Sequence, residues 1–153
     1  KKDSCQSRMG LPDYVVFMRK PGENPDRVTH TNESFPVSEW QDYASPVWSE
    51  VNSPVWWEIN QSDTLNSNIV MDTESERHIC PLQLPVIERC IRLYSNPGDV
   101  IFTPFLGIGS EVYQAILMGR KGIGIELKPA YFNSAKQNIM SAEALSGQTS
   151  LFD

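Results

Sequence analysis

The segment 98–127, GDVIFTPFLGIGSEVYQAILMGRKGIGIEL, limits the possible folds of this chain more than any other stretch. It opens with the apolar run 100–102, which predicts a strand, and passes into a turn that contains Gly107 and Gly109. From Ser110 the apolar residues recur at helical spacing. The pattern therefore predicts a strand, a glycine turn and a helix in direct succession.

A second strand is expected after this helix, because positions 123, 125 and 127 are apolar and alternate with other residues. Glu126 closes that strand. Glycines in such a turn permit positive φ angles and a close approach of the backbone to a ligand, and the helix that follows presents free N–H groups. A carboxylate at the tip of the next strand suits a ribose diol. The unit is interpreted as half of a nucleoside site, with a purely structural strand-to-helix turn as the alternative.

The motifs around this unit resemble those of the beta-type DNA amino-methyltransferases. In that family the S-adenosylmethionine segment reads H-x-x-P, a helix, G-D-x-V, D/S-P-F-x-G-x-G-S/T and G-x-E-x-x-x-x-Y, and it follows the target-recognition region. The matching positions here are His78, Pro81, Gly98, Asp99, Pro104, Phe105, Gly107, Gly109, Ser110, Gly124, Glu126 and Tyr131. A dinucleotide dehydrogenase would have a third glycine at position 112, which is Val.

The resemblance implies S-adenosylmethionine as cofactor and no metal. Phe105 and the backbone of Gly107 and Gly109 would surround the nucleoside and methionine parts, Glu126 would bind the ribose, and residues 78–82 would close over the methionine end. Many family members carry Asp where this chain has Thr103. The full set of implied cofactor residues is His78, Cys80, Pro81, Leu82, Thr103, Pro104, Phe105, Gly107, Gly109, Ser110, Glu126 and Leu127.

The expected fold class is α/β, as part of a Rossmann-like methyltransferase fold with an irregular target-recognition insert. We expect residues 1–20 to end the catalytic subdomain, 21–76 to form the insert, 77–144 to form the cofactor subdomain and 145–153 to form a flexible tail. The first region includes an expected strand over 14–18, which is rich in β-favouring residues. The insert is expected to hold at most one short helix, near residues 38–43, with Ser38 as its cap.

Two tandem copies of Ser-Pro-Val-Trp, in residues 45–52 and 53–60, stand where the insert is richest in tryptophan. One copy could replace the family's catalytic D/N/S-P-P-aromatic tetrapeptide, which holds the target amine and stacks on the flipped base. The alternative is a structural role for the tryptophans. The weak catalytic candidates are Ser45, Trp48, Ser53 and Trp56. No other sequence of that type occurs, so we expect the catalytic half of the sheet to be missing and this chain alone to be inactive.

The charge of the chain is unevenly distributed. Residues 1–30 hold six Lys or Arg and four Asp or Glu, whereas residues 31–76 hold none and nine. The acidic middle is a poor phosphate-binding surface. DNA contacts are therefore expected from Arg8, Arg19, Lys20 and Arg27, with a solvated mixed surface as the alternative. The three cysteines lack metal-ligand spacing, which is typical of reduced thiols in a cytoplasmic protein.

The C-terminal third contains two expected helices. Ser110 would cap the first, whose inner face would be Val112, Ala115, Ile116 and Gly119, and Pro129 would open the second. In the second helix Phe132, Ala135, Ile139 and Ala142 have helical spacing. Tyr131 and Phe132 could flank an adenine ring, or Phe132 could pack in the core.

The final residues resemble the short peptide with which bacterial proteins dock on the replicative sliding clamp. Gln148 would make the polar contacts, and Leu151 and Phe152 would fill an apolar pocket. Fraying, or folding back onto the last helix, is the alternative.

The expected function is site-specific methylation of double-stranded DNA, similar to that of the phage and prophage adenine-specific type. The chain would supply the cofactor-binding and target-recognition portion, and a missing N-terminal half would be its partner. Two other functions remain open: a non-catalytic remnant that binds DNA or protein, and a small-molecule methyltransferase.

Overall fold

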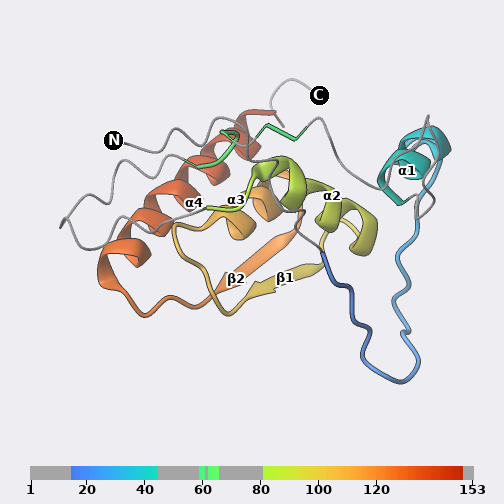
Figure 1. Ribbon diagram of the computed structural model, residues 1–153. Coiled ribbons are helices and arrows are strands. Elements are labelled where there is room, and N and C mark those ends of the chain that lie inside the picture. The colour runs from blue at the N-terminus through green and yellow to red at the C-terminus, as the bar shows by residue number, and fades with distance from the viewer. Residues whose placement is uncertain (1–14, 45–58, 61, 66–80, 150–153) are drawn as a thin grey trace, which may run out of the picture.

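The computed structural model describes residues 15–44, 59, 60, 62–65 and 81–149. The described residues form four helices and two strands (Figure 1). They are α1 (Val37–Ala44), α2 (Leu84–Tyr94), β1 (Val100–Thr103), α3 (Ser110–Leu117), β2 (Lys121–Gly124) and α4 (Pro129–Thr149). No helix in the described ranges combines the length and the apolar character needed to cross a membrane.

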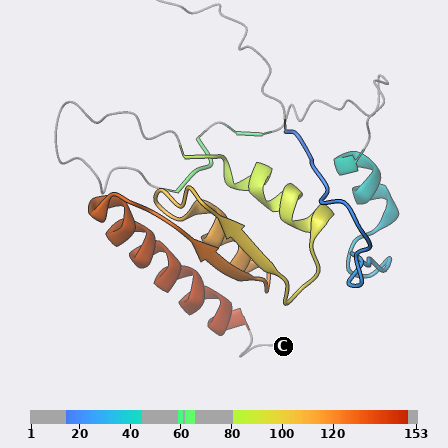
Figure 2. The ribbon, with the colours of Figure 1, turned by 90° about the horizontal axis from the view of Figure 1, so that it is seen from below.

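The two strands form a parallel pair, in which Val100 lies opposite Lys121 and Thr103 lies opposite Gly124. Parallel neighbours need a crossover connection, and α3 provides it. Helices α2, α3 and α4 all lie on the same side of this sheet (Figures 1 and 2). The order strand, turn, helix and strand predicted over 98–127 is confirmed, but the second strand ends at Gly124, so Ile125, Glu126 and Leu127 follow the strand and are not part of it.

Two glycines of β2 let this layer of helices approach the sheet closely. A Cβ atom at Gly122 would lie 2.5 Å from Cγ1 of Val112, and one at Gly124 would lie 2.5 Å from Cδ1 of Leu106. Both distances are far below van der Waals contact. Leu106 and Val112 are buried together with Ala135 of α4, so α3 is packed between the sheet and α4.

A second apolar cluster holds α2 against α3 and β1. Ile87, Ile91 and Ala115 are buried, and Leu84 and Ile101 pack against them. The helix that the motif order places between Pro81 and Gly98 is thus confirmed, and it buries one face. Pro85 stands in its first turn, where the missing N–H group has no helical partner to lose.

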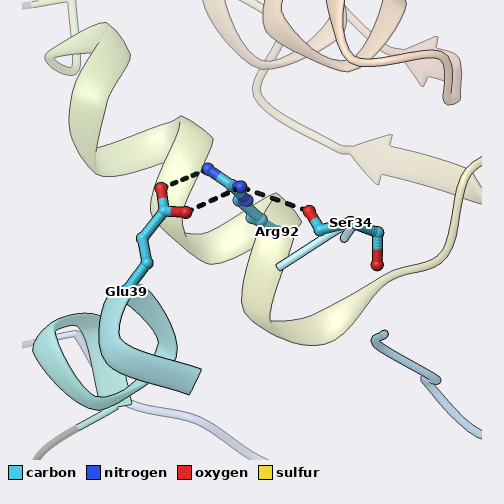
Figure 3. Close-up of polar contacts among 3 residues, drawn as sticks. All are labelled: Ser34, Glu39 and Arg92. Atoms are coloured by element: carbon cyan, nitrogen blue, oxygen red, sulfur yellow. Dashed lines mark hydrogen bonds and ion pairs between the residues drawn. The ribbon is translucent and has the colours of Figure 1, made fainter. Parts of the chain in front are cut away.

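Helix α1 and the residues just before it are attached to the C-terminal half of α2. The guanidinium of Arg92 donates two hydrogen bonds to the carboxylate of Glu39 on α1, one of them 2.9 Å long, and a third of 3.2 Å to the carbonyl of Ser34 (Figure 3). The same guanidinium lies 4.5 Å from the ring centre of Phe35, which is buried. A bidentate pair with a stacked guanidinium fixes orientation as well as distance.

The expected short helix of the insert is confirmed, but its expected cap is wrong. Helix α1 begins at Val37, and the N–H of Trp40 bonds to the carbonyl of Pro36 at 2.9 Å. Ser38 therefore lies inside the first turn. Ser110 likewise follows the cap of its helix, because Gly109 occupies that position and no side chain bonds there.

The strand expected over 14–18 is wrong for its described part, because residues 15–20 have no regular structure. A strand needs a hydrogen-bonded neighbour, and the described sheet consists of β1 and β2 alone. The ring of Phe17 lies instead 4.1 Å from that of Tyr94, at the end of α2. Tyr14 lies outside the described residues.

The C-terminal expectations are confirmed in part. Pro129 opens α4, and Ala135 and Ala142 are fully buried. Core packing of Phe132 is wrong, because 44% of it is exposed: the helix reaches α3 through its small residues instead. Residues 145–149 belong to α4 and are not a flexible tail, since the alanine-rich sequence before them favours a continuous helix. Gly119 follows α3 rather than lining it.

Candidate cofactor site

The glycine turn begins where β1 ends. The hydroxyl oxygen of Thr103 accepts a hydrogen bond of 3.3 Å from the N–H of Phe105, and the N–H of Leu106 donates to the carbonyl of Ile125 at 2.9 Å. Thr103 is buried, whereas Phe105 is 84% exposed. The backbone bonds hold the turn against the end of β2, and the Phe105 ring projects into solvent beside it.

Gly107 and Gly109 have φ angles of 54° and 96°, a region that side chains with a Cβ rarely adopt. Space at position 109 is also tight, because a Cβ there would lie 3.3 Å from the backbone and side chain of Ala135 and would require α4 to shift by a few tenths of an ångström. Helix α3 begins at the next residue, so its free N–H groups follow the turn directly. This geometry matches the one expected from the sequence.

Asn138 of α4 supports the turn from the other side. Its side-chain amide donates a hydrogen bond of 2.8 Å to the carbonyl of Ile108. The sequence reading missed this residue. The sequence did contain a signal for it: Asn138 is a polar residue about one helical turn after Ala135 and next to Ile139, on a helix face otherwise lined by small and apolar residues.

Glu126 lies at the same edge of the sheet, two residues beyond the end of β2. Its carboxylate accepts hydrogen bonds from the N–H of Gly107 at 2.9 Å and from the N–H of Lys128 at 2.8 Å. The residue is half-buried. Glu126 thus joins the glycine turn to the loop that leads into α4, as a carboxylate placed between two backbone donors.

Lys128 and Tyr131 extend this edge. The Lys128 ammonium lies 5.0 Å from the ring centre of Tyr131. Tyr131 is half-buried and Leu127 is exposed. A half-buried aromatic ring can accept a flat heterocycle by stacking.

Glu111 is the one acidic residue in the first turn of α3. Burial raises the pKa of its carboxyl group, and a backbone hydrogen bond partly opposes this shift. Its charged form is therefore disfavoured close to the turn. Burial also raises the pKa of the Cys90 thiol, which makes this cysteine a poor nucleophile.

The structure describes some of the remaining predicted cofactor residues and not others. Pro104 is exposed beside the turn, Ser110 is buried at the start of α3, and Pro81 and Leu82 precede α2. The N–H of Leu84 bonds to the carbonyl of Asp63, so the end of the insert meets the first turn of α2. His78 and Cys80 lie outside the described residues.

The residues predicted to contact DNA are not brought to the glycine turn. The carbonyl of Arg27 accepts a 3.0 Å bond from the side chain of Asn96, in the loop that precedes β1. Asn96 precedes β1, so this attachment lies at the amino end of the strand, whereas the glycine turn lies at the carboxyl end. Figure 2 shows α1 beside the end of α2 and away from the start of α4. Arg19 and Lys20 are exposed on the same extended segment. Arg8 and the weak catalytic candidates Ser45, Trp48, Ser53 and Trp56 lie outside the described residues.

Comparison with known proteins identifies the family. Residues 11–137 match the family model N6_N4_Mtase, described as DNA methylase. The chain therefore belongs to the N6/N4 DNA amino-methyltransferase family, as the motif order suggested.

Two curated relatives illustrate the similarity. The type II methyltransferase M1.MboII of Moraxella bovis is 30% identical over 120 residues, which are 77% of this chain and 45% of that protein. The DNA adenine methyltransferase YhdJ of Escherichia coli is 36% identical over 77 residues, which are 49% of this chain and 26% of that protein. The chain thus spans less than half the length of either relative.

Among solved structures, the complex of TTHA0409 from Thermus thermophilus with S-adenosyl-L-methionine matches with a TM-score of 0.53 and 22% identity. The match covers 86% of this chain and 48% of that one. It shows that the chain has part of a Rossmann-like methyltransferase fold, as expected.

Proposed function

We propose that the intact protein is an S-adenosylmethionine-dependent DNA methyltransferase specific for adenine, and that this chain is its cofactor-binding and target-recognition portion. The observation that carries the proposal is the convergence of the positive-φ glycine turn, the start of α3 and the Glu126 carboxylate at one edge of the sheet. Ligands of open α/β sheets bind at this carboxyl edge.

The residues present fit the cofactor. A ribose diol can donate to the Glu126 carboxylate, because the residue is half-buried and each carboxylate oxygen can accept more than one hydrogen bond. The exposed ring of Phe105 can cover one side of the ligand, and Tyr131 can stack against a base. Thr103 offers a hydroxyl without negative charge, so it would contribute a hydrogen bond and no ion pair to the ammonium group of the methionine part.

When bound, S-adenosylmethionine would supply a methyl group on a positively charged sulfur: the nitrogen of an exocyclic amine bonds to the methyl carbon, the neutral thioether leaves with the C–S electron pair, and the amine loses one proton to solvent. The described part of this chain would bind and orient the cofactor and exclude water from its nucleoside side. The target base must leave the duplex to reach such a site. Neither the Cys90 thiol nor any covalent intermediate is required.

The proposal extends to the division of labour in the intact protein. No D/N/S-P-P-aromatic tetrapeptide occurs in the sequence, so the group that holds the target amine would come from a segment outside this chain. The chain alone should bind cofactor without methylating DNA. Addition of the complementary half, by fusion or in trans, should restore methylation.

Calorimetric titration with S-adenosylmethionine, alongside NAD as a control ligand, tests the cofactor part. We expect saturable binding of S-adenosylmethionine and no binding of NAD. Transfer of tritiated methyl groups to duplex DNA then tests the catalytic part, with and without the complementary half. Cofactor binding without methylation in the completed protein would favour the non-catalytic remnant, and methylation by this chain alone would assign the base platform to Trp48 or Trp56.

Docking on the sliding clamp stays a prediction. Gln148 lies in the last turn of α4, whereas Leu151 and Phe152 lie outside the described residues. An extended docking peptide would therefore require the last helical turn to unwind. A labelled peptide of residues 145–153 that binds the clamp, and loses binding on Phe152→Ala, would support the prediction.

A further inference from the structure

The side chain of Asn96 binds the insert through both groups of its amide. Its Nδ2 donates a hydrogen bond of 3.0 Å to the carbonyl of Arg27, and its Oδ1 accepts one of 2.8 Å from the N–H of Thr29. In an extended segment, the carbonyl of one residue and the N–H two residues later point to the same side, where one residue of a parallel strand would bond to both. The Asn96 amide therefore takes the place of one residue in a neighbouring strand.

The side chains of the held segment alternate as an extended conformation requires. Val28 and His30 are half-buried, whereas Arg27 and Thr29 are exposed. The His30 ring meets the ring of Phe35 edge-on, with 4.9 Å between the ring centres. The segment thus has an inner side that packs on the insert and an outer side that carries the guanidinium of Arg27.

A second set of contacts holds the insert close to the first. The Arg92 guanidinium binds the carbonyl of Ser34 and the carboxylate of Glu39, from the last turn of α2 (Figure 3). Asn96 follows four residues later and is itself fixed, because its N–H donates a 2.7 Å bond to the carboxylate of Asp99. The position of this part of the insert is therefore set by side chains of the cofactor-binding portion.

Arg27 is exceptional in the charge of the insert. Residues 21–76 contain eleven Asp or Glu but a single Lys or Arg, which is Arg27. Affinity for duplex DNA comes largely from cations that neutralise its phosphates. Carboxylates can accept hydrogen bonds from base amino groups but are repelled by phosphate. Among Lys and Arg side chains, only Arg27 can therefore give the insert an ion pair with a phosphate, and Arg27 is the residue whose carbonyl Asn96 holds.

The held segment and the cofactor turn lie within reach of one duplex. They are at opposite ends of β1, which has four residues. At 3.3 Å per residue, this strand separates them by about 13 Å. One helical turn of DNA is about 34 Å long. A duplex whose target base enters the cofactor site can therefore present a flanking phosphate to Arg27 within one turn.

We propose that Arg27 is the residue with which the insert binds a DNA phosphate, and that Asn96 is the positioning residue that fixes it. This inference rests on the proposed function and names the contact that holds the duplex against the insert. A backbone that is fixed before binding loses less conformational freedom when its side chain meets the phosphate. Because the contact is with the DNA backbone, it contributes equally to every DNA sequence.

The experiment measures binding of a fluorescent duplex by the complete product of the gene, by anisotropy over a series of salt concentrations. Arg27→Ala and Asn96→Ala should each raise the Kd for DNA about 5- to 10-fold and reduce the slope of log Kd against log salt by about one, as loss of one phosphate contact requires. The Kd for S-adenosylmethionine should stay within about twofold of wild type, because the cofactor turn lies at the other end of β1. Gln137→Ala, which removes an exposed amide from α4, is the matched control.

The double variant separates positioning from general support of the fold. If Asn96 acts through Arg27, adding Asn96→Ala to Arg27→Ala should raise the Kd for DNA by less than about twofold. Arg27→Lys should restore the salt slope, because it retains the charge. All titrations are made below the melting transition of each variant. In the wild type, the Thr29 N–H should exchange at least about tenfold more slowly than in a free peptide of residues 25–31, a measurement that depends on no variant.

An unchanged salt slope in Arg27→Ala, additive effects in the double variant, an unprotected Thr29 N–H, or a wild type that binds no duplex would overturn the proposal. A folded Asn96→Ala protein with weakened S-adenosylmethionine binding would assign Asn96 to support of the cofactor site and overturn it as well. Failure of the proposed function gives a different result. A wild type that shows the expected DNA contacts but methylates no DNA would reject the methyltransferase function alone, and methylation with unchanged DNA affinity in the variants would reject the Arg27 contact alone.

Discussion

Replacing Glu126 tests the cofactor site most directly, because its carboxylate holds the glycine turn in place. In Glu126→Ala the N–H groups of Gly107 and Lys128 lose their acceptor, at 2.9 and 2.8 Å. Both are charge-assisted bonds, but Glu126 is only half-buried and water can replace part of each. We therefore expect the loss of about 1 kcal/mol per bond, or about 2 kcal/mol of unfolding free energy.

A loss of that size should lower the melting temperature by roughly 4–8 °C in a domain of this length. The effect on the cofactor is separate. If the ribose hydroxyls donate to the carboxylate, Glu126→Ala should weaken S-adenosylmethionine binding by about 1–3 kcal/mol, which is about 5- to 150-fold in Kd. Glu126→Gln retains one acceptor oxygen and should give an intermediate loss of affinity.

Calorimetry at a temperature well below the melting transition of every variant separates the two effects, and Glu143→Ala, on an exposed position of α4, serves as control. Unchanged affinity in a folded Glu126→Ala protein would refute the ribose assignment. If the melting temperature falls while the affinity does not, Glu126 only supports the turn.

Three further changes test other parts of the structure. Asn138→Ala removes the donor to the turn carbonyl, so we expect weaker S-adenosylmethionine binding by about 1 kcal/mol and faster amide exchange in the turn; calorimetry and exchange that match wild type would contradict this. Arg92→Met should lower the free energy of unfolding by about 1–2 kcal/mol. In denaturant unfolding, a double-mutant cycle with Glu39→Gln should show that the effects of the two substitutions are coupled. Additive effects would mean that the pair does not anchor α1. Burial raises the pKa of Glu111 above its unfolded value, so the wild type loses stability as pH rises through the folded pKa. Glu111→Gln should therefore raise the melting temperature at neutral pH and lose this advantage below about pH 4, and an equal shift at both pH values would exclude the titration.

The β-turn-α-β unit could be predicted from sequence because each part has a strong local signal. Glycines at 107 and 109, the apolar run before them and the alternation after α3 depend only on neighbours in the chain. The helix boundaries were harder to predict. Both predicted serine caps lie one or two residues inside their helices, because the first helical hydrogen bonds are accepted by the carbonyls of Pro36 and Gly109.

The long-range arrangement could not be predicted. Residues 14–18 have the composition of a strand, but strand formation depends on a neighbour that local sequence does not reveal. The docking of α1 depends on contacts that Arg92 makes with Glu39, Ser34 and Phe35, which are far from it in the chain. Asn138 was missed for the same reason, because its importance arises only when α4 meets the turn.

The two glycines of β2 set a limit on how this protein can be redesigned. Val or Ile at position 122 would raise the strand propensity of β2, and a design procedure that rewards local propensity would favour either change. However, a Cβ there would lie 2.5 Å from Val112, so α3 would have to move away from the strand by roughly 1 Å to restore ordinary contact. Since α3 starts immediately after Gly109, this displacement would pass directly into the glycine turn. A variant with higher strand propensity at position 122 is therefore expected to bind its ligand with lower affinity.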